Sequence, residues 1–220
     1  MTSVLADAVT HGLGVALSPL VIIVLVMILL SPRSRPNGAA FLVGWLAGLA
    51  GLGALIFALG GAGDGAGRPL LDSALNVGFG LLLLGLAARS WMRRHLPHER
   101  PRWLTAVDTL TLPKAAAAGC FFAAIYPKNL ALTATAASGM ASALGSGGAA
   151  AYLLFAIIAS LTIAGPVLTC LVLGDRITPA LTWVQGWLSR HGPAVLILLL
   201  AFFGAKLLLR GGVQLAGLAG

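Results

Sequence analysis

Two neighbouring residues in an apolar part of the chain, Pro127 and Lys128, are the ones best placed to do chemistry. Lys128 stands about 20 Å of helix beyond Lys114, which puts it well inside a bilayer core about 30 Å thick. Pro127 removes a helix hydrogen bond and clashes with the preceding turn, so we expect the helix to break there. A charge beside a broken helix is typical of the sites that transporters build in the middle of a membrane.

The chemistry favoured by this pattern is the binding of an anion. A helix that restarts after a break presents free N–H groups and the positive end of its dipole to a negatively charged group. We expect a phosphate, sulfate or carboxylate to be held there, with Lys128 neutralising its charge. The candidate substrate-binding residues are Ser18, Pro19, Asp72, Asn76, Tyr126, Pro127, Lys128, Asn129 and Thr133.

Two structural interpretations of Lys128 stay open beside the functional one. Its ammonium can pair with Asp72 or with an inward backbone carbonyl, or it can reach an interface along its long stem. Asn76 is ranked lower because a polar residue on a membrane helix more often hydrogen-bonds a neighbouring helix.

Metal-dependent and enzymatic chemistry is not expected. The six carboxylates fall at segment ends or in loops, whereas a hard cation needs several oxygen ligands. We find no nucleophile–base pair, phosphate-binding loop or metal-ligand spacing, and so predict no enzyme activity and no cofactor. The histidines, His11 among them, are expected in solvated positions, and the coupling ion stays open. Cys120 and Cys170 are expected to pack as small hydrophobes.

The composition is that of a polytopic membrane protein. Of the 220 residues 59% are hydrophobic and only 9% are charged, with a mean hydropathy of +0.98. The net charge of +8 does not indicate nucleic-acid binding, because the basic residues cluster between apolar segments.

Six apolar segments are predicted to span the membrane. They cover about residues 6–30, 38–60, 71–88, 113–138, 149–173 and 193–209. Gly165 and Pro166 interrupt the fifth and form a candidate hinge. Asp72 is expected to cap the third segment, and a short interfacial helix within 174–192 is expected to precede the sixth.

Basic residues crowd the first, third and fifth loops, which are therefore predicted to be cytoplasmic. Both termini then face outward. Each half of the chain begins with a proline-broken helix and has three spans, which is the pattern of an inverted 3+3 repeat. We divide the single membrane domain, 1–220, into a first repeat (1–90), a basic cytoplasmic linker (91–112) and a second repeat (113–220).

Several motifs resemble a known family. The runs Ala16-Leu17-Ser18-Pro19, Leu30-Ser31-Pro32-Arg33, Phe41-Leu42-Val43-Gly44-Trp45 and Pro127-Lys128-Asn129-Leu130 are similar to those of the GAP family. This Sap-like family, named after glycopeptidolipid-addressing proteins, belongs to the lysine-exporter (LysE) superfamily. Tyr126 stands where the superfamily pattern often has Asn. The resemblance implies a six-helix inner-membrane exporter whose cargo is an envelope lipid or glycolipid.

Together these observations favour a secondary transporter that exports an anionic or amphiphilic envelope compound across the inner membrane by alternating access. The alternatives are an exporter of a small solute such as an amino acid, and a non-transporting accessory protein of envelope lipid assembly. The expected partners are membrane lipids and a small-molecule or lipid substrate, without nucleic acid; a homo-oligomer is an open option.

Overall fold

A computed structural model describes residues 2–61, 67–92, 110–141 and 147–219, and among them it contains helices and no strand. Side chains are described for these residues except 2–3, 60–61, 67–72, 175 and 217–219. The elements in chain order are α1 (Thr2–Ala16), α2 (Pro19–Leu29), α3 (Ser34–Gly61), α4 (Gly67–Met92), α5 (Leu112–Ala124), α6 (Pro127–Ala141), α7 (Gly148–Leu173), the 3-10 helix η3 (Gly174–Ile177) and α8 (Thr178–Ala219).

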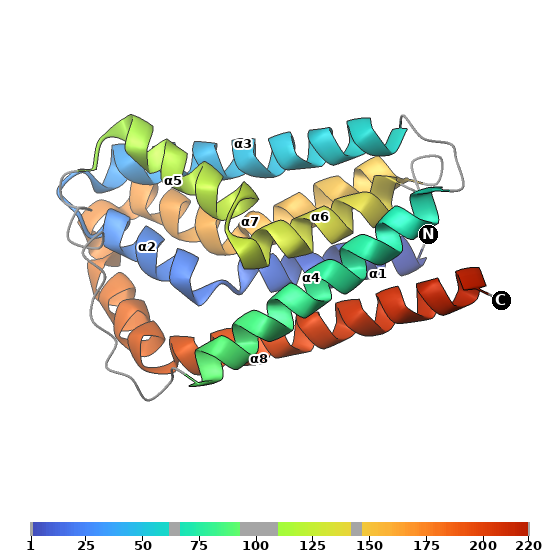
Figure 1. Ribbon diagram of the computed structural model, residues 1–220. Helices are drawn as coiled ribbons and strands as arrows, with labels where there is room; N and C mark the ends of the chain where they lie inside the picture. Colours follow the sequence, from blue (N-terminus) through green and yellow to red (C-terminus); the bar gives the residue numbers. More distant parts are fainter. Residues whose placement is uncertain (1, 62–66, 93–109, 142–146, 220) are drawn as a thin grey trace.

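The predicted breaks at Pro19 and Pro127 are confirmed. Helices α1 and α2 meet at 54°, and α5 and α6 meet at 59°. At the first break Ser18 is extended and Pro19 begins α2, where its missing N–H costs no hydrogen bond. Each bent pair runs through the length of the bundle, and the two pairs run in opposite directions (Figure 1).

The chain is a multi-pass membrane protein. Helices α3, α4, α7 and α8 are each long and apolar enough to cross a bilayer, and the number of crossings rises to six if each bent pair is one span. Both chain ends lie at the same end of the bundle (Figure 1).

Glycines allow the helices to pack with their backbones close together. A Cβ added at Gly44 in α3 would lie 2.6 Å from the carbonyl carbon of Ala116 in α5, and one at Gly119 would lie 2.8 Å from the backbone nitrogen of Trp45. Gly51, on the same helix, has nothing within 4 Å.

The main helix pairs follow a recurring pattern. α3 packs along α5, α1 along α7 and α4 along α8, and α2 contacts α8 while α6 contacts α4. Trp45 of α3 donates a hydrogen bond to Ser160 of α7 (3.2 Å), and Tyr152 of α7 donates one to the carbonyl of Leu49 (2.6 Å). These buried bonds join the two halves of the chain.

Three expectations about helix ends are wrong. α7 continues through Pro166 without interruption. The interfacial helix before the sixth segment is not separate, because α8 is one helix that contains Pro193; its first part runs at an angle to the rest (Figure 1). Asp72 does not cap α4, which begins five residues earlier at Gly67. The division into two repeats and a linker stays a prediction, and residues 93–109 of that linker lie outside the described part.

Candidate functional site

The two breaks meet in the interior and are joined by side chains. Ser18 donates its hydroxyl proton to Oδ1 of Asn129 at 2.9 Å, across a separation of 111 residues. Asn129 in turn donates from Nδ2 to the carbonyl of Phe122, at 2.8 Å, in the last turns of α5. Asn129, near the start of α6, therefore links this helix both to the first break and to the end of α5.

Lys128 lies at the same junction and is 1% exposed. Its Nζ donates to the backbone carbonyl of Gly14 and, at 3.3 Å, to that of Leu17. A third carbonyl at this end of α1, that of Ala16, accepts from the hydroxyl of Thr162 at 2.8 Å. The last carbonyls of a helix have no partner within it and carry the negative end of its dipole, so a cation there is electrostatically favourable.

This geometry matches one of the structural alternatives for Lys128, a backbone-carbonyl partner. The other alternative, a pair with Asp72, involves a side chain that lies outside the described ones. Whether Lys128 also contacts a substrate stays a prediction.

The remaining predicted residues near the motif differ in their surroundings. Pro19 is buried, Pro127 is exposed, and the half-buried ring of Tyr126 lies 5.8 Å from that of Phe122, edge to face. Thr133 is fully buried, and its hydroxyl has no hydrogen-bond partner among the described residues. A buried hydroxyl without a partner costs about 1–3 kcal/mol, which is a reason to suspect a ligand or water there.

Asn76 belongs to a different polar group, as its lower rank suggested. It donates from Nδ2 to Oε1 of Gln214 at 3.0 Å, linking α4 to α8. The candidate hinge residues Gly165 and Pro166 lie inside α7, where the hydroxyl of Thr169 donates to the carbonyl of Gly165 at 2.8 Å. A hinge motion there stays a prediction.

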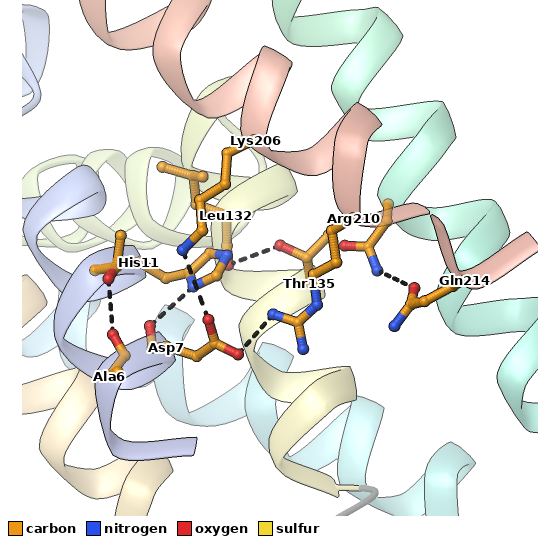
Figure 2. A network of polar contacts seen from close by, with 10 residues as sticks. Ala6, Asp7, His11, Leu132, Thr135, Lys206, Arg210 and Gln214 are labelled. Atoms are coloured by element: carbon orange, nitrogen blue, oxygen red, sulfur yellow. Dashed lines mark hydrogen bonds and ion pairs between the residues drawn. The ribbon is translucent and has the colours of Figure 1, made fainter. Parts of the chain in front are cut away.

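A cluster of charged residues between α1 and α8 was missed by the sequence reasoning. Asp7 of α1 forms ion pairs with Lys206 (3.6 Å) and Arg210 (2.6 Å) of α8, whose side chains point toward it (Figure 2). His11, one turn further along α1, is 1% exposed and its Nδ1 lies 2.8 Å from the carbonyl of Asp7. The expectation of a solvated His11 is therefore wrong.

The spacing of the cluster was a usable signal. Asp7 and His11 are four residues apart, as are Lys206 and Arg210, so each pair lies on one face of its helix. Two pairs of polar groups at that spacing in apolar helices indicate two polar helix faces, each of which needs a polar partner inside the bundle.

Within the described ranges no group of three or more His, Cys, Asp or Glu side chains could hold a metal ion. Cys120 and Cys170 are free thiols.

Comparison with known proteins identifies the family. Residues 9–213 match the family described as Sap, sulfolipid-1-addressing protein. No curated protein and no solved structure matches the chain at a significant level. The match confirms the resemblance to the Sap-like GAP family found in the motifs. By a match over nearly its whole length, the chain belongs to the sulfolipid-1-addressing protein family.

Proposed function

We propose that the chain is a secondary transporter with six spans in two inverted repeats. The opposite directions of the two bent pairs support this arrangement, as does the matched packing of α3 on α5 and of α1 on α7. An even number of crossings also agrees with both termini lying at one end of the bundle. Paired broken helices of opposite direction are the usual frame for alternating access.

The proposed cargo is an anionic or amphiphilic envelope compound of the lipid or glycolipid class. The family is described by the addressing of a sulfolipid, and a sulfated lipid carries the kind of headgroup that a buried cation would recognise. The proposed direction is export across the inner membrane, with both termini on the outer side.

The observation that carries the proposal is the buried Lys128 at the meeting point of the two broken helices. Among the described side chains and backbone, its ammonium donates to two neutral carbonyls, that of Gly14 in α1 and that of Leu17 directly after it. An anionic headgroup offers a full negative charge in place of these partial charges, so it can draw Lys128 away from α1. Once Lys128 no longer bonds to the end of α1, the bent pair of α1 and α2 would be free to move. Binding of the headgroup would in this way be coupled to the change of access.

The test compares Lys128→Met with Lys114→Met, a change of the same kind at an exposed lysine of α5. Both variants are produced in cells that depend on the chain, and the envelope lipids extractable from the cell surface are measured by mass spectrometry. Hydrogen bonds to charged groups contribute about 1.5–3 kcal/mol, so the Lys128 variant should export at least about tenfold less per folded molecule. The Lys114 variant should export normally.

The amount and thermal unfolding midpoint of each variant in nonionic detergent separate a loss of function from a loss of fold. Undiminished export by a folded Lys128→Met protein would falsify the proposed role. A change in surface amino acids without a change in lipids would favour the small-solute exporter instead.

A further inference from the structure

A small polar cavity lies apart from the junction of the two breaks, between α4, α6 and α8. Its volume is about 20 Å³, and it is lined by Leu75, Asn76, Thr135, Ser138, Gly139, Arg210 and Gln214. Thr135 stands about 12 Å along α6 from Pro127, toward the end of the bundle that carries both termini. The cavity is large enough for one water molecule or one oxygen atom of a ligand.

We propose that this cavity is a second binding site, which takes the sulfate or phosphate headgroup of a membrane lipid. The proposal deepens the proposed function and rests on it for the lipid class of the ligand. Its test measures binding and not transport, so the two can fail separately.

The charges around the cavity favour an anion. Asp7 is shared by Lys206 and Arg210, which leaves one positive charge in excess in this group. A guanidinium has five N–H donors in a planar fork that matches two oxygens of an oxyanion, and the bond from Nη1 to Asp7 uses one of them. Arg210 is therefore able to hold an anion beside its ion pair or in place of it.

One neutral donor adds to the site. Gln214 accepts from Asn76 through Oε1, so its amide nitrogen is the group left to donate toward a ligand. The hydroxyl of Thr135 donates to the carbonyls of Ala131 (2.8 Å) and Leu132 (3.3 Å), which fixes its rotamer at the cavity wall. Figure 2 shows Arg210, Thr135 and Gln214 gathered on one side of Asp7.

The surface beside Arg210 is suited to lipid chains. Leu209 and Val213, its neighbours on α8, are 71% and 73% exposed. In a membrane-spanning helix such apolar surface faces acyl chains, while Arg210 itself is partly exposed, with 36% of its side chain accessible. A lipid can thus place its tails along α8 with its headgroup at the guanidinium.

The size of the cavity sets the mechanism of binding. The cavity has room for one of the several oxygens of an oxyanion headgroup, so the other oxygens compete with the carboxylate of Asp7, which lies outside the cavity lining, for the N–H groups of Arg210. Asp7 is therefore a competitor for the site. Removing Arg210 should weaken binding, and removing the charge of Asp7 should strengthen it.

The experiment uses the full chain in dodecyl maltoside micelles and native mass spectrometry. The probes are a sulfated galactosylceramide, unsulfated galactosylceramide, and inorganic sulfate as a competitor. Arg210→Gln should lower the affinity for the sulfated lipid by about tenfold or more, because a charge-assisted hydrogen bond is lost. Asp7→Asn should raise that affinity several-fold, and the unsulfated lipid should bind weakly to every variant.

Two control variants remove the same charge elsewhere. Lys206→Gln takes away a partner of Asp7 that does not line the cavity, so its effect should be about threefold or less. Arg190→Gln removes an exposed arginine from the same helix and should have no effect. Asn76→Leu, which keeps all charges, should weaken binding and so tests the cavity independently of net charge.

The outcomes separate the sources of the anion. Competition by inorganic sulfate with the same dependence on Arg210 supports recognition of the oxyanion itself, and binding of the sulfated lipid without such competition supports recognition of headgroup and tails together. Equal losses in Arg210→Gln and Arg190→Gln, or weaker binding by Asp7→Asn, would overturn the proposal. The gain expected for Asp7→Asn cannot be imitated by misfolding.

Discussion

Replacing Gly44 by alanine should separate α3 from α5 and weaken the whole bundle. An added Cβ would meet the carbonyl group of Ala116, with its carbon 2.6 Å and its Cα 2.8 Å away. All of these atoms belong to the backbone, so no side-chain rotation can relieve the clash. The matched control is Gly51→Ala on the same helix, where a Cβ meets nothing within 4 Å.

The size of the effect follows from these distances. Carbon atoms in contact lie about 3.5–4.0 Å apart, so α5 must move away by about 1 Å at Ala116. Overpacking of this kind costs about 1–3 kcal/mol, while the gain in helix propensity from Gly to Ala is the same at both positions of α3 and cancels in the comparison. The two variants should therefore differ by roughly 1–3 kcal/mol, or on the order of 2–12 °C in unfolding midpoint for a chain of this size.

The same displacement should reach the site. Phe122 lies on α5 six residues beyond Ala116, and its carbonyl accepts the 2.8 Å hydrogen bond from Asn129. A shift of about 1 Å lengthens this bond beyond the usual range, so Gly44→Ala should also reduce export per folded molecule. Thermal unfolding in nonionic detergent and surface lipid analysis provide the two measurements. Equal midpoints for the two alanine variants would refute the packing argument.

Two further predictions test the junction and the topology. In a double-mutant cycle of Ser18→Ala and Asn129→Leu, the coupling energy should be about 0.6 kcal/mol and at most about 1.7 kcal/mol, the mean and the maximum found for hydrogen bonds between membrane helices; additive effects would show that the 2.9 Å contact contributes nothing. Alkaline phosphatase, which is active only outside the cytoplasm, should be active when fused to either terminus and inactive when fused within residues 93–109; the reverse pattern would invert the predicted orientation.

The breaks were predictable from sequence because each rests on the local chemistry of a proline. Pro127 frees carbonyls at the end of α5, and Asn129, two residues later, donates to one of them. Lys128 likewise donates to backbone carbonyls at the end of α1, those of Gly14 and Leu17. Pro166 shows that a proline alone does not determine where a helix breaks, because α7 continues through it as one helix. A break needs groups that stabilise the freed backbone as well as a missing N–H.

Which two charged helix faces pair with each other was not predictable at the level of segments. Asp7 and Arg210 are separated by 203 residues, and only the packing of α1 near α8 brings them together. The predicted sixth segment ends at Leu209, so Arg210 falls outside it. The hydrophobic pattern of the sequence shows that each segment is an apolar helix. It does not show which other helix packs against it, because that depends on the tertiary arrangement.

The partners of the two cations predict different affinities for an anionic headgroup. Lys128 is held by carbonyls at the end of α1, whose combined dipole is equivalent to about half a negative charge. Arg210 is held by Asp7, a full negative charge, at 2.6 Å.

On the proposed mechanism, an anionic headgroup replaces a weak competitor at Lys128 and a strong one at Arg210. It is therefore bound more firmly at the junction of the breaks and released more readily at the cavity, which lies toward the face that carries both termini and that the charge distribution predicts to be the outer one. Asp7→Asn would remove this difference, so it should strengthen binding at the cavity while slowing release.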